Sequence, residues 1–151
     1  MGALILYLAS NYTIQKKEVN GQNSFNPVEN SVALPNTHSS DKPTIDELTE
    51  ENVVIAYVKQ HHELPDYYIT KAEARKQGWV ASKGNLCDVL PGRAIGGDHF
   101  SNREKNLPVG AKYFEADVNY NCGRRNSDRI VFTKQGDVYL TKDHYRSFQK
   151  K

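Results

Sequence analysis

The C-terminal part of the chain holds side chains that could transfer protons and bind phosphate. Glu115 lies in a segment where polar and apolar residues alternate, and two arginines, Arg125 and Arg129, follow it four positions apart. His144 comes near the C-terminus. A carboxylate and an imidazole can act as base and acid, while guanidinium groups bind phosphate oxygens through paired N–H donors. Together these residue types are sufficient to cleave a phosphodiester without a metal ion.

The alternation predicts where these side chains point. In residues 113–120 the odd positions include Glu115, Asp117 and Asn119, and the even positions are all apolar or aromatic. Because successive side chains of a strand point to opposite faces, this pattern predicts a half-exposed antiparallel strand with one polar face. Glu115 should therefore lie on the exposed face of a sheet.

Two further strands are predicted after this segment, at 129–133 and 138–141, around a turn that contains a glycine. Arg125 and Arg129 are both at odd-numbered positions, which would point to the same face of an extended chain. His144 follows the second of these strands. Short connections between successive strands then place all four chemical groups on one sheet surface. Each of these residues, taken alone, could also belong to a solvated strand face with ordinary cross-strand ion pairs. Their complementary roles favour the catalytic interpretation.

The charges are unevenly distributed along the chain. The net charge of the 151 residues is +2, but residues 45–98 hold six basic and nine acidic residues, and residues 99–151 hold eleven and six. A basic half that carries the candidate site suits a polyanionic substrate, because positive potential concentrates nucleic acid at a cleft. A lysine-rich tail that only aids solubility is the alternative. The length allows one domain with a modest core, and the mean hydropathy of −0.71 indicates a polar protein without membrane association.

The N-terminal residues differ from the rest. An apolar run at 3–9 has the length of a signal-peptide core, although no basic residue precedes it, and it is too short to span a membrane. We interpret it as the remnant of an export signal; a stray apolar patch is the alternative. Residues 16–43 lack apolar periodicity, which predicts a disordered spacer or propeptide. The predicted organisation is an N-terminal segment, 1–43, and a folded domain, 44–151.

Helices come first in the predicted domain. Apolar spacing predicts a helix over 46–62, and a second helix begins after Thr70 and ends at Gly78. A short helix is expected at 85–89. Strands follow at 94–95, 113–120, 129–133, 138–141 and 147–148. This order predicts an α+β fold in which N-terminal helices pack on a C-terminal antiparallel sheet.

The chain has two cysteines, Cys87 and Cys122, which are 35 positions apart. A zinc site would need His99 or His144 as a further ligand, and a pair of buried free thiols is another possibility. In an exported protein, an even number of cysteines in a small domain favours a disulfide. Closing a loop of this length would stabilise the fold by roughly 3–4 kcal/mol. No metal or other cofactor is predicted.

From about residue 45 to residue 148 the sequence resembles the small guanyl-preferring bacterial ribonucleases, the barnase-like family with the microbial ribonuclease fold. The resemblance extends over segments in the same order with short gaps. These segments are LPD at 64–66, YITK at 68–71, GWVASKGNL at 78–86, IGGD at 95–98, FSNRE at 100–104, EAD at 115–117, RNSDRI at 125–130 and DHY at 143–145.

The resemblance implies specific catalytic roles. Glu115 would be the base and His144 the acid of a transesterification that forms a 2′,3′-cyclic phosphate, and their roles would reverse when water opens the ring. Arg125 and Arg129 would bind the phosphate, and Lys71 would stabilise the transition state. The reaction would require no metal.

The resemblance also implies a guanine-binding loop. Its backbone amides would donate to guanine O6, and the Glu104 carboxylate would accept from N1 and N2. The implied substrate-binding residues are Phe100, Ser101, Asn102, Arg103, Glu104 and Tyr145.

The sequence is also compatible with two other functions. The same scaffold could be a catalytically silent RNA-binding module, or the toxin domain of a delivered antibacterial system that uses the same chemistry. The family resemblance implies RNA as substrate and an acidic barstar-like intracellular inhibitor as a partner. The apolar run at 3–9 predicts secretion to the extracellular space, and we expect a monomer.

Overall fold

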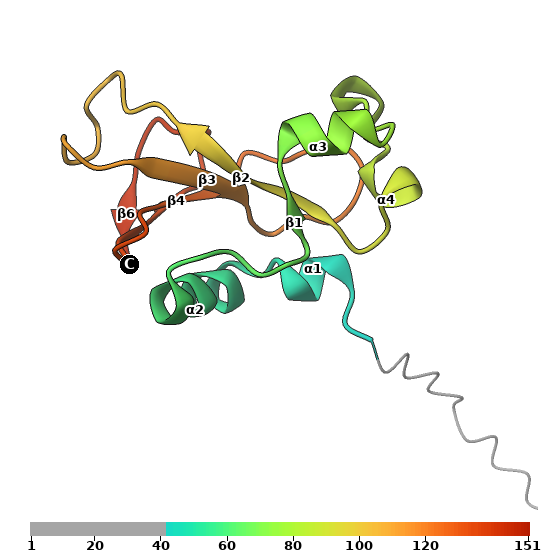
Figure 1. The fold of residues 1–151 in the computed structure, drawn as a ribbon, viewed down its shortest axis with the longest axis horizontal. Coiled ribbons are helices and arrows are strands. Elements are labelled where there is room, and N and C mark those ends of the chain that lie inside the picture. The colour runs from blue at the N-terminus through green and yellow to red at the C-terminus, as the bar shows by residue number, and fades with distance from the viewer. Residues whose placement is uncertain (1–41) are drawn as a thin grey trace, which may run out of the picture. The chain divides into compact units, whose positions relative to one another are not determined.

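The computed structural model describes residues 42–151, and Figure 1 shows the arrangement of their helices and strands. The apolar run and nearly all of the spacer predicted within residues 1–43 lie outside the described residues. Within residues 42–151 no helix is long and apolar enough to cross a membrane.

The first predicted helix is two helices, α1 (Ile45–Leu48) and α2 (Glu51–His61), so the prediction of one continuous helix is wrong. Long-range contacts interrupt it. The carbonyl of Thr49 accepts a hydrogen bond at 2.7 Å from the backbone of Asn119, far along the chain. The Glu50 side chain then accepts two backbone N–H groups in the first turn of α2 and starts a new helix.

The remaining helices follow their local signals. The helix α3 (Lys71–Lys76) begins after Thr70, whose hydroxyl accepts a backbone N–H of the first turn. It ends before Gly78, whose φ of 98° is in the left-handed region that favours glycine. The 3₁₀ helix η1 (Ala81–Lys83) and the helix α4 (Leu86–Val89) complete the helical part.

Six strands form one sheet in chain order, and all neighbouring pairs except the first are antiparallel. The parallel pair involves a strand of two residues that the sequence pattern did not predict. The last strand lies two residues beyond its predicted position. The strands are β1 (Tyr68–Ile69), β2 (Ala94–Phe100), β3 (Tyr113–Asp117), β4 (Arg129–Phe132), β5 (Val138–Thr141) and β6 (Gln149–Lys150). The predicted α+β class is confirmed.

Hydrophobic residues cover both faces of the sheet. The main core lies on the helical side, where α2 packs on the sheet, and includes Val54, Val58 and Ile130. A smaller cluster on the other face is formed by Leu107, Tyr113, Val131 and Tyr139, with Phe100, Tyr145 and Phe148 packed against it. The loops that follow β2 and β5 supply several of these residues and cover the second face.

The prediction of a half-exposed β3 is therefore wrong. Glu115 is 6% exposed and Asp117 is 1% exposed, although both belong to the polar side of the alternation. Their face is buried because the smaller hydrophobic cluster, including Tyr113 and Tyr145, and their own charged partners lie over it.

The two cysteines form a disulfide. Cys87 of α4 is bonded to Cys122 in the loop between β3 and β4, with their Cα atoms 5.7 Å apart. Neither cysteine is therefore a free thiol, and neither is available as a zinc ligand. The bond ties the loop that carries the first arginine of the candidate site to the helical part.

We expect this disulfide to form in protein made in an oxidising compartment. Thiol titration of denatured, unreduced protein should then find no free thiol. The Cys87→Ser/Cys122→Ser variant should lose roughly 3–4 kcal/mol of unfolding free energy, because its unfolded chain is no longer constrained. Denaturant unfolding of the two proteins measures this difference. Two titratable thiols in the unreduced protein would contradict the pairing.

Candidate active site

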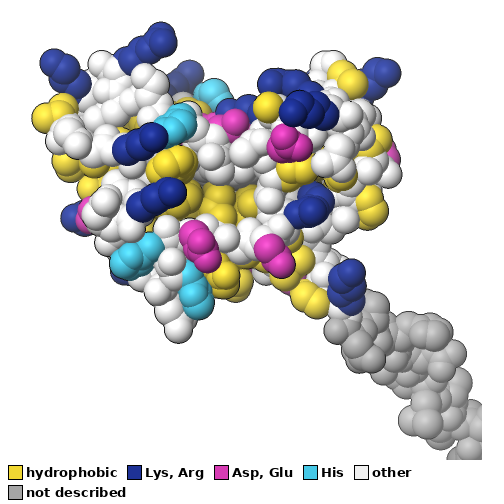
Figure 2. Space-filling view, viewed as in Figure 1, with side chains coloured by type: hydrophobic (Ala, Val, Ile, Leu, Met, Phe, Trp, Pro, Cys, Tyr) yellow, Lys and Arg dark blue, Asp and Glu magenta, His cyan; other side chains and the backbone are white. Residues whose placement is uncertain are grey.

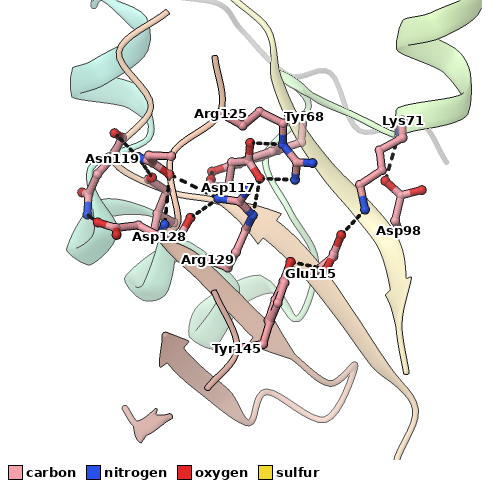
Figure 3. A network of polar contacts seen from close by, with 12 residues as sticks. Tyr68, Lys71, Asp98, Glu115, Asp117, Asn119, Arg125, Asp128, Arg129 and Tyr145 are labelled. Carbon is pink, nitrogen blue, oxygen red and sulfur yellow. Dashed lines mark hydrogen bonds and ion pairs between the residues drawn. The ribbon is translucent and has the colours of Figure 1, made fainter. Parts of the chain in front are cut away.

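Glu115 lies at the centre of a network of charged and polar groups on β3 (Figure 3). Lys71 donates a hydrogen bond to its Oε1 and the hydroxyl of Tyr145 donates to its Oε2. Burial, with this hydrogen bond to the carboxylate, raises the pKa of Tyr145, so the hydroxyl keeps its proton. Two donors from opposite sides thus hold the carboxylate in one orientation.

Lys71 is positioned by the start of α3. Its backbone N–H donates to Oδ2 of Asp98 at 3.0 Å, which fixes the first turn of α3 to β2. The Lys71 side chain then crosses to Glu115 on the neighbouring strand β3 (Figure 3). The sequence prediction placed Lys71 near the reaction centre, and the structure brings it into direct contact with Glu115.

Asp117 holds the two arginines. It forms a bidentate pair with Arg125, with Nε to Oδ2 at 2.7 Å and Nη2 to Oδ1 at 2.6 Å. Nε of Arg129 lies 2.8 Å from Oδ1 as an ion pair, outside hydrogen-bond geometry. The Tyr68 hydroxyl donates to the Asp117 carbonyl at 2.7 Å and secures this part of β3. Partial burial of Arg125 opposes its charge, but the bonds to Asp117 raise its pKa.

The parity that Arg125 shares with Arg129 does not place Arg125 on a strand. The strand β4 begins at Arg129, and Arg125 belongs to the loop before it. Asp117, rather than strand parity, brings the two guanidinium groups together. Asp117 is not among the site residues that the sequence predicts, although it lies on the same face of the predicted strand as Glu115.

His144 is exposed, in the turn after β5. Asp143 organises this turn: its Oδ1 accepts the backbone N–H of Ser147 at 2.9 Å and its Oδ2 accepts the Ser147 hydroxyl at 2.6 Å. These bonds lower the pKa of Asp143 to about 2. His144 and Tyr145 both have left-handed φ angles, 54° and 70°. The turn therefore presents His144 to solvent and directs the next side chain, Tyr145, to Glu115.

His144 lines a pocket together with the predicted guanine loop. The pocket has a volume of about 330 Å³. Tyr145 also lines it, and Tyr145 reaches Glu115, so the pocket and the buried carboxylate adjoin each other. The loop residues that line it are Phe100, Ser101, Asn102, Arg103, Glu104 and Asn106.

The loop residues are not equivalent. The Asn102 side chain closes the loop, because its Nδ2 donates to the Leu107 carbonyl at 2.7 Å and its Oδ1 accepts the Leu107 N–H at 3.1 Å. The Phe100 ring packs 5.1 Å from the Tyr145 ring. Glu104 is exposed, and within residues 42–151 no hydrogen bond or ion pair engages its carboxylate. Its side chain is therefore available to a ligand.

The ribonuclease family model matches residues 52–151, a range that contains every residue of this site. Ribonucleases of Bacillus intermedius and Bacillus pumilus are each 47% identical over 114 residues, covering 74% of this chain and 70% of the relative. A ribonuclease of Heyndrickxia coagulans is 52% identical over 99 residues, 64% of this chain and 91% of the relative. This chain belongs to the barnase-like family of microbial ribonucleases. Membership of this ribonuclease family makes the protein an endoribonuclease, with RNA as its substrate.

Proposed function

We propose that this ribonuclease cleaves single-stranded RNA after guanosine by transesterification to a 2′,3′-cyclic phosphate, which it then hydrolyses. One observation carries the proposal. Glu115 is held by two donors and lies on the same face of β3 as Asp117, which holds two arginines. The exposed His144 lines the adjoining pocket. This arrangement supports a reaction in which Glu115 is the base, His144 the acid, and the arginines bind the phosphate.

In the first step Glu115 accepts the proton of the ribose 2′-hydroxyl, and the 2′-oxygen forms a bond to phosphorus. The bond from phosphorus to the 5′-oxygen breaks, and protonated His144 gives its proton to that oxygen. In the second step neutral His144 takes a proton from water, and the water oxygen forms a bond to phosphorus. The bond from phosphorus to the 2′-oxygen breaks, and protonated Glu115 gives its proton to that oxygen. Both residues end in their starting states.

The cations stabilise the negative charge that develops on the phosphate oxygens. Arg125 and Arg129 are held by Asp117, so their donors need little reorganisation when the phosphate binds. Lys71 pairs with Glu115 in the free protein. When Glu115 takes a proton its charge is lost, and the ammonium of Lys71 then serves the phosphate instead.

Guanine preference is proposed for the loop after β2. Asn102 fixes the loop conformation through Leu107, which leaves backbone amides able to donate to guanine O6. The exposed Glu104 carboxylate supplies the acceptor for guanine N1–H and N2–H₂. Adenine lacks these donors at the matching positions, so it cannot form the same contacts.

Replacing Glu104 by Gln tests the guanine site. The variant should cleave guanylyl-linked dinucleotides about 5- to 150-fold less efficiently, because an amide donor would face guanine's own donors, a cost of roughly 1–3 kcal/mol. Cleavage of adenylyl-linked dinucleotides should change little. The quantity to compare is kcat/KM on both substrates. Glu63→Gln, at an exposed acid in the loop after α2 that does not line the pocket, is the charge-matched control. An equal fall on both substrates would mean that Glu104 only maintains the loop.

We further propose that the protein is secreted and is neutralised by an acidic inhibitor inside the producing cell. The disulfide supports the first proposal, because such bonds form and persist in oxidising compartments. Lys71 and Arg125, the two partly exposed cations of the site, support the second, since an acidic partner would complement their charges. A purely RNA-binding module would not need both an acid and a base in this arrangement.

A further inference from the structure

A second groove lies apart from the pocket that His144 lines. It has a volume of about 720 Å³ and is bordered by the end of the loop between β2 and β3 and by the turn between β4 and β5. Phe114 and two lysines, Lys112 and Lys134, are among its lining residues. None of the residues assigned to the proposed reaction lines this groove.

A row of aromatic rings crosses three strands beside the groove. Phe132 of β4 pairs with Phe114 of β3, which pairs with His99 of β2, so the three are cross-strand neighbours. Their ring centroids are 5.8 Å and 4.7 Å apart. Exposure rises along the row: Phe132 is buried, Phe114 is half-buried and His99 is exposed. The row therefore begins in the core and ends as an open ring at the surface.

This row lies on the opposite face of the sheet from the proposed catalytic residues. Phe114 and Glu115 are successive residues of β3, and successive side chains of a strand point to opposite faces. Phe114 packs against the main core, whereas Glu115 contacts Tyr145 on the other side. A molecule bound along the row would leave the catalytic face accessible.

The groove has a positive balance of charge. Its acidic lining residue, Asp137, is paired with Lys150 at 3.3 Å. The Nζ of Lys134 lies 5.6 Å from the centre of the Phe114 ring, and no ion pair within residues 42–151 neutralises Lys112 or Lys134. In Figure 2 several Lys and Arg side chains lie over the end of the molecule where Figure 1 shows the loop between β2 and β3, and others lie over the helical end.

We propose that the aromatic row and the two lysines form a second binding surface for single-stranded RNA. Exposed aromatic rings beside cations are the features with which proteins bind unpaired nucleic acid, because every base can stack and every phosphate is charged. His99 offers the open ring, and Lys112 and Lys134 offer the phosphate contacts. The inference rests on RNA as the substrate class and not on the catalytic roles of Glu115 or His144.

The surface should act on long substrates alone. A dinucleotide fills the proposed active site and cannot also reach the opposite face of the sheet. A long RNA can contact both, which raises its local concentration at the active site. Loss of the second surface should therefore raise KM for long RNA and leave dinucleotide cleavage unchanged.

Binding of a fluorescent single-stranded DNA of about 20 nucleotides tests the surface directly, because DNA lacks the 2′-hydroxyl and is not consumed. The variants are Lys112→Gln/Lys134→Gln and, separately, His99→Ala, all at exposed positions. Lys76→Gln/Lys83→Gln removes two exposed lysines from α3 and η1 and is the matched control.

Each phosphate contact contributes about 0.7 to the slope of log Kd against log salt concentration on a single strand, so the Lys112/Lys134 variant should lower that slope by about 1.4. His99→Ala should weaken binding at least about fivefold through lost stacking. The control should alter neither quantity comparably. Equal effects in variant and control, or unchanged binding in both variants, would overturn the proposal and favour another occupant, such as a protein.

Cleavage assays separate this proposal from the proposed function. The variants should cleave a guanylyl-linked dinucleotide at the wild-type rate, which also shows that they are folded. Their kcat/KM on a long single-stranded RNA should fall. If the variants lose activity on long RNA but the protein does not prefer guanosine, the second surface stands and the proposed base preference fails. If the protein prefers guanosine but the variants keep full activity on long RNA, the second surface is refuted.

Discussion

Replacement of His144 by Ala should reduce the cleavage of a guanylyl-linked dinucleotide by about 10²- to 10⁴-fold, the usual contribution of a general acid. The 5′-oxygen would have to leave without a proton, and water would lack a base in the second step. The fold should be unaffected, because the side chain is exposed and the turn around it is held by Asp143. Initial rates of dinucleotide cleavage, with unfolding measured in parallel, test this expectation.

The control is His61→Ala, which removes an exposed histidine from the end of α2. It should leave both the rate and the stability near those of the wild type. A near-normal rate in His144→Ala would remove this residue from the mechanism. The acid would then have to be sought among the other groups that border the same pocket.

Glu115 should be equally important to the rate, and its variants can separate chemistry from structure. The carboxylate is buried between Lys71 and Tyr145, so Glu115→Ala leaves two polar groups without their partner and should also lower stability. Glu115→Gln keeps the shape of the side chain and an acceptor oxygen but cannot accept the 2′-hydroxyl proton. Both variants should lose about 10²- to 10⁴-fold in cleavage rate.

The comparison between the two Glu115 variants decides the role of the residue. If Glu115 serves only to hold Lys71 and Tyr145 in place, Glu115→Gln should retain much of the activity that Glu115→Ala loses. If it is the base, both should be similarly inactive while Glu115→Gln is the more stable of the two. Rates and denaturant unfolding measured on the same preparations give the answer.

Local sequence signals predicted the elements of the fold better than their ends and exposures. Strands β4 and β5 and the helix after Thr70 follow from alternation, a glycine turn and capping residues, which all act within a few positions. The break between α1 and α2 depends on Asn119, whose contact with Thr49 joins distant parts of the chain. No local pattern contains that information. The strand β1 has only two residues, too few for a periodic signal.

The same distinction applies to the site. The alternation of polar and apolar residues in 113–120 places Glu115 and Asp117 on one face of β3. It does not show that other parts of the chain bury that face. Arg125 reaches the site through its bidentate bond to Asp117 and not through a strand. The contact of Tyr145 with Glu115 depends on a turn in which both His144 and Tyr145 have left-handed φ angles. Neither residue type favours that conformation, so the sequence does not predict the turn.

The nature of the first product tests the central claim most directly. Wild-type protein incubated with a guanylyl-linked dinucleotide should release a nucleoside with a free 5′-hydroxyl and accumulate guanosine 2′,3′-cyclic phosphate before any guanosine 3′-phosphate. The same experiment with an adenylyl-linked dinucleotide should proceed much more slowly. Chromatography of samples taken during the reaction separates these species. Release of a 5′-phosphate, or of guanosine 3′-phosphate without the cyclic intermediate, would contradict transesterification by Glu115 and His144.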